Sequence, residues 1–243
     1  MTRGTYGFKV RGYECGADGL ATLPTVCKYL QEVASLHAES LGFSKSDFEK
    51  AGDNVSWVLT RLLVRMNRYP AWGDEVTVET FPRGGRKIVA WRDFILKDAR
   101  GETLGVATSE WMVIDLSTRK IAPLPVKVLE AVDPSNVPVL GTEPFTRFRF
   151  PASAGSGFGE GDPASFVAMK AHIDLNGHVN NVHYIEWMLE PCANARPVEM
   201  EIVFRSETFV GDRVHADVAE ADGFTYHRVC DAAGADHIVA RTR

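Results

Sequence analysis

Apolar residues recur at two different spacings along this chain, and the two spacings occur in the same order twice. Alternating apolar and polar residues, typical of half-buried strands, predict strands at 55–67, 75–82, 86–98 and 102–115, and again at 198–206, 212–220, 224–231 and 236–242. Turn residues separate these strands at Gly84-Gly85, Asp98 to Gly101, Asp222-Gly223 and Ala233-Gly234. The two series therefore predict two antiparallel sheets.

A segment with helical spacing precedes each series of strands. The first helix is expected to open near Pro24, since proline suits the first helical turn, and to stop at Gly42. Its apolar stripe consists of Val26, Leu30, Val33 and Leu36 or His37. The stripe of the second helix consists of Val179, Val182, Ile185 and Leu189. One long helix wrapped by a curved antiparallel sheet makes an α+β unit, and the chain predicts two such units in tandem.

The two halves indicate an internal duplication. Asp18 lies six residues before Pro24, just as Asp174 lies six residues before Asn180. Pairing by eye from the aspartates and from the turn glycines gives these expected matches: Leu20 opposite Asn176, Thr22 opposite His178, and Tyr69 opposite Glu207. The first half is thus expected to keep the shape of the unit and to lack its polar residues.

Proline and glycine mark the join between the halves. Seven of the twelve prolines lie between Pro123 and Pro163. We therefore expect an N-terminal unit at 1–125, a linker at 126–164 and a C-terminal unit at 165–243. The glycines at 155, 157, 159 and 161 have no strand-turn-helix context, so a linker is a better interpretation than a phosphate-binding loop.

Composition narrows the function classes. The net charge of −5 lacks the basic excess expected for nucleic-acid binding. No apolar run approaches the ~20 residues of a membrane span, and no signal segment is visible, so a cytoplasmic location is expected. The four cysteines are scattered and are expected to be reduced thiols. No His or Cys pair has metal-ligand spacing, so no metal site is predicted.

The segment 174–187 contains the most informative chemistry. Asp174, Asn176 and His178 stand at alternate positions directly before the second helix. A carboxylate, an amide and an imidazole near the free N–H groups of a helix start suit chemistry on a carbonyl group. Backbone N–H groups near Gly177, His178 and Val179 are expected to stabilise an oxyanion. Helix capping by Asp174, Asn176 or Asn180 is the simpler alternative for each residue alone.

Three segments resemble signatures of the acyl-acyl carrier protein thioesterases of the FatA/FatB type. They are Asp174 to Trp187, Trp57 to Arg61 continuing through Arg68 to Val76, and Trp111 to Lys120 with Pro123 and Pro125. The resemblance implies a double hotdog fold, which agrees with the duplication. It also implies release of free fatty acid from acyl carrier protein by hydrolysis of the thioester. No bound cofactor is implied, since phosphopantetheine arrives on the substrate.

The same resemblance implies a catalytic set of Asp174, Asn176, His178 and Glu207. Glu207 is included because Arg205 to Thr208 occupies the place of the family's Arg-x-Glu-Cys, with Thr208 where the family has cysteine. This departure disfavours a neighbouring cysteine as nucleophile. Glu207 is the first choice for the general base acting on water, while His178 shares the proton and Asn176 positions the reactants. Asp174 is the alternative base, because a similar Asp serves in single-hotdog thioesterases.

Two further groups of residues follow from this interpretation. The expected substrate-binding residues are Trp57, Leu59, Val26, Leu30, Val33 and Asn180, mostly in the half that lacks the polar set. Basic residues are expected to dock the acidic carrier protein, namely Arg119, Lys120, Arg86 and Lys87. The alternatives are a hotdog acyl-CoA thioesterase and a non-catalytic acyl-binding protein. A monomer that pairs its own halves and a homodimer are both compatible with the sequence.

Overall fold

The computed structural model describes residues 3–152, 164–192 and 196–243, and these fall into two compact units. Unit 1 comprises Met1–Ala21 and Thr25–Pro144, and unit 2 comprises Thr22–Pro24 and Phe145–Arg243. The four linker glycines at 155, 157, 159 and 161 lie outside the described residues.

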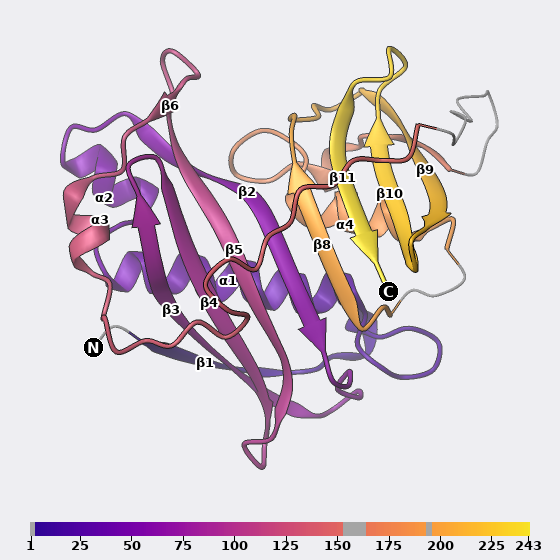
Figure 1. Ribbon diagram of the computed structural model, residues 1–243, viewed down its shortest axis with the longest axis horizontal. Helices are drawn as coiled ribbons and strands as arrows, with labels where there is room; N and C mark the ends of the chain where they lie inside the picture. Colours follow the sequence, from indigo (N-terminus) through magenta and orange to yellow (C-terminus); the bar gives the residue numbers. More distant parts are fainter. Residues whose placement is uncertain (1–2, 153–163, 193–195) are drawn as a thin grey trace. The chain divides into compact units, whose positions relative to one another are not determined.

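Unit 1 is an antiparallel sheet in the order β1-β3-β4-β5-β2, with the short β6 paired to β5 (Figure 1). Helix α1 crosses one face of this sheet in Figure 1. The elements of unit 1 are β1 (Gly4–Lys9), η1 (Gly12–Glu14), α1 (Leu23–Ser40), α2 (Lys45–Lys50), β2 (Val55–Met66), β3 (Glu75–Arg86), β4 (Val89–Asp98), β5 (Thr103–Asp115), β6 (Ile121–Ala122) and α3 (Val126–Glu130).

The buried face of α1 follows the predicted stripe. Val26, Leu30 and Val33 are buried, and the stripe continues through His37, which is 2% exposed, rather than Leu36, which is 37% exposed. His37 is accommodated because its Nδ1 lies 2.8 Å from Nη1 of Arg92 on β4. Burial, with a smaller effect of the Arg92 charge, lowers the pKa of His37 to about 4, so the ring is neutral and can accept this hydrogen bond.

The turn expected at Gly84-Gly85 is displaced in the structure. Strand β3 runs through both glycines to Arg86, and the chain turns at 87–88 instead. The glycines serve packing: a bulge interrupts the β3–β4 register between Pro82 and Gly84, and a Cβ on Gly85 would lie 2.7 Å from Leu129 of α3. Such a Cβ would also lie 2.8 Å from the backbone carbonyl oxygen of Val89, so Gly85 is required by the close approach of the neighbouring strand and of α3, not by a turn.

Unit 2 repeats the architecture with the sheet order β8-β11-β10-β9-β7, and α4 contacts β9 and β10. In Figure 1 α4 lies behind the strands of this sheet. Its elements are β7 (Ser165–Val167), η2 (Lys170–His172), α4 (Asn181–Leu189), β8 (Glu199–Phe204), β9 (Arg213–Ala221), β10 (Phe224–Cys230) and β11 (Asp236–Thr242). The expected α+β class and the antiparallel sheet in each half are confirmed.

A long helix was expected in each half, but the helix of unit 2 is short. It has 9 residues, against 18 in α1. Pro191 explains the early end, since proline has no N–H to donate to the carbonyl of Trp187 four residues earlier and cannot extend the helix. Val179, expected on the helix, lies before the N-cap residue Asn180 and is buried in a bridge with Ile173.

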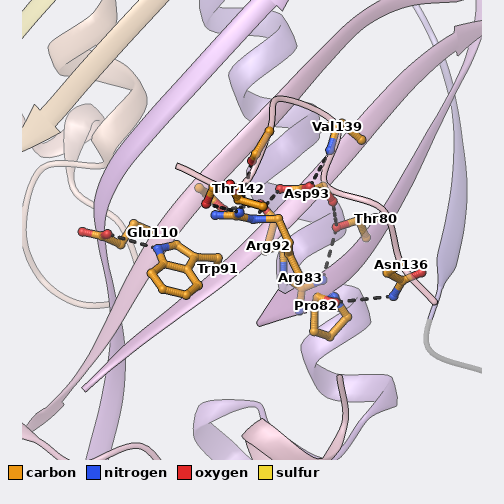
Figure 2. Close-up of polar contacts among 12 residues, drawn as sticks. Thr80, Pro82, Arg83, Trp91, Arg92, Asp93, Glu110, Asn136, Val139 and Thr142 are labelled. Atoms are coloured by element: carbon orange, nitrogen blue, oxygen red, sulfur yellow. Dashed lines mark hydrogen bonds and ion pairs between the residues drawn. The ribbon is translucent and has the colours of Figure 1, made fainter. Parts of the chain in front are cut away.

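Part of the expected linker belongs to unit 1. Residues 126–130 form α3, and the segment after it binds to a buried ion pair between Arg83 of β3 and Asp93 of β4. Asp93 accepts the N–H of Val139 at 2.9 Å, and Arg83 donates to the carbonyl of Thr142 at 2.9 Å (Figure 2). These contacts hold the segment 136–142 against strands β3 and β4.

The two units match loop for loop where each helix begins. In unit 1 the N–H of Gly16 donates to the carbonyl of Leu20 at 2.9 Å, and in unit 2 the N–H of Asp174 donates to that of His178 at 3.0 Å. Gly19 and Gly177 occupy the same left-handed position, with φ of 78° and 83°.

This match corrects the pairing expected at the helix starts by two residues. Gly16 corresponds to Asp174, Asp18 to Asn176 and Leu20 to His178. The Tyr69–Glu207 pairing holds, since Ala21 N–H donates to the Pro70 carbonyl as Val179 N–H donates to that of Thr208, each at 2.8 Å. Unit 1 carries a leucine and a tyrosine where unit 2 has an imidazole and a carboxylate.

Candidate active site

The loop before α4 is organised by Asp174. Its Oδ1 accepts the backbone N–H of Asn176 at 2.7 Å, and its Oδ2 lies 3.4 Å from the Asn176 side-chain nitrogen. The carbonyl of Asp174 accepts the N–H of Gly177 at 3.0 Å. Gly177 takes a left-handed φ of 83°, which glycine adopts without strain. The aspartate therefore shapes the turn that presents Asn176, whose side chain is exposed.

His178 and Glu207 meet although they are distant in sequence. The Nε2 atom of His178 lies 3.5 Å from Oε1 of Glu207. Glu207 lies in the loop between β8 and β9. The two side chains are 23% and 29% exposed, so solvent reaches both. An imidazole and a carboxylate at this separation can contact the same water molecule and exchange a proton through it.

A backbone hydrogen bond fixes the two loops to each other. The N–H of Val179 donates to the carbonyl of Thr208 at 2.8 Å. These residues directly follow His178 and Glu207 in sequence, so the bond joins the backbones next to both side chains. Their separation is consequently set by main-chain structure as well as by side-chain rotamers.

Of the three backbone N–H groups expected to stabilise an oxyanion, one is available for that role. The N–H of Gly177 is used within the turn and that of Val179 binds Thr208, whereas within the described residues no acceptor takes the N–H of His178. Asn180 is the N-cap of α4, and its side-chain oxygen accepts the N–H of Val182 at 3.0 Å. The geometry of Asn180 thus supports the capping role.

Unit 1 contains an apolar cavity of about 110 Å³ instead of a polar set. Its walls come from α1, β2, β3, β4, β5, α3 and the segment after α1, and include Ala34, Ala38, Phe43, Trp57, Ala90, Trp91, Arg92 and Trp111. The three indole N–H groups donate to protein oxygens, at 2.7–3.2 Å, so the tryptophans offer the cavity apolar surface.

Only Trp57 of the expected substrate-binding residues in this unit lines the cavity. Val26 and Leu30 line a smaller void without room for water, while Val33 and Leu59 are packed in the core. The helix contributes Ala34 and Ala38, which each follow a stripe residue by one position and so lie on the neighbouring face of the helix. Trp91 and Trp111, which the sequence analysis did not assign to the site, could have been found from their places on strands that pair with each other.

The expected docking residues lie in turns at one end of the unit 1 sheet. Arg86 and Lys87 are at the β3–β4 turn, and Arg119 and Lys120 are at the β5–β6 turn, all exposed. The N–H of Leu124 donates to the Lys87 carbonyl at 2.7 Å, which brings the segment after β6 beside the β3–β4 turn. The structure therefore gathers the four cations at the same sheet end.

Each of the two tandem units is a helix packed on a curved antiparallel sheet, and this repeat defines a double hotdog protein. Within the described residues, the pair formed by His178 and Glu207 in the second unit makes the candidate hydrolytic site. The chain matches the family described as acyl-ACP thioesterase N-terminal domain over residues 4–132 and that described as acyl-ACP thioesterase C-terminal domain over residues 164–243. It therefore belongs to the acyl-ACP thioesterase family.

Individual relatives agree with this assignment. The chain is 38% identical over 197 residues to the oleoyl-acyl carrier protein thioesterase 1, chloroplastic, of Arabidopsis thaliana, covering 75% of this chain and 53% of the relative. It is 34% identical over 191 residues to a palmitoyl-acyl carrier protein thioesterase of Gossypium hirsutum, covering 75% and 45%. The chain spans about half the length of these curated relatives.

Solved structures share the fold. A 12:0-ACP thioesterase from Umbellularia californica superposes with a TM-score of 0.84 at 24% identity, covering 100% of this chain and 97% of that one. An acyl-ACP thioesterase from Bacteroides thetaiotaomicron gives 0.83 at 23% identity, covering 99% and 97%. The expected double hotdog fold is thereby confirmed.

Proposed function

We propose that the protein hydrolyses the thioester of acyl-acyl carrier protein and releases a free fatty acid. The observation that carries this proposal is the contact between His178 and Glu207 at 3.5 Å, beside the turn shaped by Asp174 in a member of this family. No resident metal or cofactor is needed, because the residues supply acid-base chemistry and phosphopantetheine arrives on the substrate. None of the helices in the described part of the chain has the length and apolar character to cross a bilayer.

The proposed reaction begins with a water molecule beside Glu207. The carboxylate removes a proton from the water as its oxygen bonds to the thioester carbon, and the carbonyl electron pair moves onto oxygen. The N–H of His178 is available to stabilise that oxyanion. The carbon-sulfur bond then breaks, and the proton held by Glu207 passes through His178 to the departing thiolate. Asn176 holds the carbonyl or the water in place.

The arrangement favours Glu207 over Asp174 as the base. Both oxygens of Asp174 face Asn176, one of them in a short hydrogen bond to its backbone N–H. Glu207 instead faces the imidazole. A carboxylate engaged in holding a turn would have to release it in order to accept a proton from water.

The assay that tests the function measures free thiol released by the purified protein from acyl-acyl carrier protein and from the matching acyl-CoA, across acyl lengths. We expect turnover of carrier-bound substrate with a higher kcat/KM than for the CoA ester. A preference for CoA esters would support the acyl-CoA thioesterase alternative. Binding of acyl chains without thiol release from either substrate would support the non-catalytic alternative. The cytoplasmic location and the monomeric or homodimeric state remain predictions.

We assign the cavity of unit 1 to the acyl chain. Replacing Ala38 or Ala90 with Leu is expected to lower kcat/KM for the longest accepted chain by about tenfold, since each excluded methylene loses about 0.8 kcal/mol and two suffice for such a change. Short chains should be hydrolysed normally. The measurement is a chain-length profile, with Ala99→Leu in the exposed β4–β5 turn as the control. An unaltered profile in both cavity variants would remove the cavity from the proposal.

We assign the cations at the sheet end to docking of the acidic carrier protein. The double variant Arg119→Glu/Lys120→Glu is expected to raise KM for acyl-acyl carrier protein about fivefold, since two exposed contacts together contribute about 1 kcal/mol. Added salt should narrow the difference from wild type. Arg100→Glu, in the turn at the opposite end of β4, is the control and should leave KM unchanged. Equal KM values for wild type and the double variant would exclude these two residues from docking.

A further inference from the structure

Three buried side chains form a hydrogen-bonded chain directly behind Glu207. The hydroxyl of Tyr184 on α4 donates to Oγ1 of Thr208 at 2.7 Å, and Oγ1 lies 2.7 Å from Nδ1 of His237 on β11. All three residues are buried. The chain thus connects the helix, the loop that carries Glu207 and a central strand of the sheet.

The same residues also hold the backbone on the other side of Glu207. The carbonyl of His237 accepts the N–H of Arg205 at 2.8 Å and lies 3.3 Å from the N–H of Ser206. The Tyr184 hydroxyl lies 3.4 Å from the carbonyl of Ser206. The segment 205–208 is therefore held before and after Glu207, whose carboxylate extends towards His178.

The protonation states of Tyr184 and His237 give the chain one direction. Burial is the main reason that the pKa of Tyr184 rises to about 12, so its hydroxyl stays protonated and donates. Burial also lowers the pKa of His237, although Asp231 and Asp212 partly offset the effect. We assign the proton of the neutral ring to Nε2, which lies 4.0 Å from Oδ2 of Asp231, and Nδ1 then accepts the Thr208 hydroxyl proton.

Unit 1 has the same backbone arrangement without any of these polar groups. The carbonyl of Leu104 accepts the N–H groups of Asn67 and Arg68 at 2.8 and 3.2 Å, as that of His237 accepts those of Arg205 and Ser206. The apolar counterparts are Leu104 for His237, Pro70 for Thr208 and Val26 for Tyr184. Val26 and Tyr184 correspond because each is the fourth residue of its helix. The loop therefore folds without a polar chain, and the chain occurs only in the unit with the carboxylate-imidazole pair.

We propose that Tyr184, Thr208 and His237 are positioning residues, which hold Glu207 at its working distance from His178 by fixing the backbone on both sides of it. This inference rests on the proposed function, because positioning matters only if Glu207 acts on water. None of the three touches the reacting atoms. A displacement of about 1 Å at such a site can lower a rate about 100-fold.

The test compares three variants of the protein. Thr208→Val keeps the shape of the side chain and removes the hydroxyl, and we expect kcat for acyl-acyl carrier protein to fall about 10- to 100-fold with KM little changed. Thr208→Ser keeps the hydroxyl and should restore kcat to near the wild-type value. Thr242→Val is the matched control: Thr242 is buried in the same unit and its Oγ1 lies 2.8 Å from Nε2 of buried His227. This control should lose comparable stability and retain kcat.

Two readouts keep the outcomes separate. If wild type releases no thiol, the proposed function is wrong; if wild type is active and Thr208→Val has an unchanged kcat, only the positioning proposal is overturned. A kcat that falls equally in Thr208→Val and Thr242→Val would also overturn it, since the loss would then follow stability. Nitrogen NMR of ¹⁵N-histidine-labelled wild type provides a test independent of activity: Nδ1 of His237 should be unprotonated and hydrogen-bonded, and a proton on Nδ1 would contradict the chain.

Discussion

Replacing Glu207 with Gln is expected to lower kcat for acyl-acyl carrier protein hydrolysis by about 10²- to 10⁴-fold, the usual contribution of a general base. The amide keeps the size of the side chain and can remain near His178, but it cannot accept the proton of the attacking water. Substrate affinity should change little, so the loss should appear in kcat rather than in KM. Single-turnover hydrolysis measures the chemical step directly.

Asp174→Asn is the informative partner of that experiment. Asparagine can still accept the N–H of Asn176 through its carbonyl oxygen, so the turn before α4 should be retained. We expect a loss of activity well below that of Glu207→Gln. If Asp174→Asn abolished single-turnover hydrolysis while Glu207→Gln remained near wild type, Asp174 would be the base and the assignment would be reversed.

Replacing Asp93 with Ala is expected to lower the free energy of unfolding by about 3–5 kcal/mol. Asp93 is 0% exposed, and burial raises the pKa of its carboxyl group despite Arg83 and the hydrogen bonds that oppose the shift. The variant would leave the largely buried Arg83 guanidinium without its ion-pair partner and would release the N–H of Val139 (Figure 2). Urea unfolding followed by tryptophan fluorescence measures the change, because several tryptophans lie in unit 1.

An exposed ion pair in the same unit provides the control for Asp93→Ala. Arg86 and Glu143 are 4.0 Å apart with side chains mostly in solvent. Glu143→Ala should change the free energy of unfolding by less than about 1 kcal/mol, as is usual for exposed pairs. Similar losses in the two variants would show that burial does not determine the strength of the Arg83–Asp93 contribution.

The strands could be predicted closely because their residues meet the same environment along their whole length. The stretches 55–67 and 236–242 differ from β2 and β11 by at most one residue. Asp222-Gly223 forms the predicted turn, with both residues at positive φ, as such a hairpin requires. Alternation and turn chemistry are local properties, and local structure followed from them.

Predictions failed where distant segments decide the structure. Gly84-Gly85 has the composition of a turn, but the approach of the Val89 carbonyl on β4 and of Leu129 from α3 requires Gly85 to lack a side chain. The pairing of Asp18 with Asp174 matched residue type, whereas the equivalent hydrogen bonds pair Asp18 with Asn176. A one-dimensional match cannot distinguish residues that look alike from residues that occupy the same place.

In the candidate site too, local features could be predicted and contacts between distant segments could not. The residue types and spacing of Asp174, Asn176 and His178 indicated carbonyl chemistry, and family resemblance added Glu207. Neither revealed the buried chain of Tyr184, Thr208 and His237, since it joins three separate elements and no sequence spacing relates them.

The order of the two main helices and of the long strands, the duplication and the kinds of chemical groups available were determined by the sequence alone, because each depends on neighbours along the chain. The short elements α2, α3, β6 and β7 were not predicted. The tertiary structure alone decided that a carboxylate from the β8–β9 loop faces an imidazole before α4, which N–H groups remain for an oxyanion, and where unit 1 leaves a cavity. Those features depend on packing between segments far apart in sequence, where hydrogen bonds and close contacts select one arrangement from many that local preferences allow.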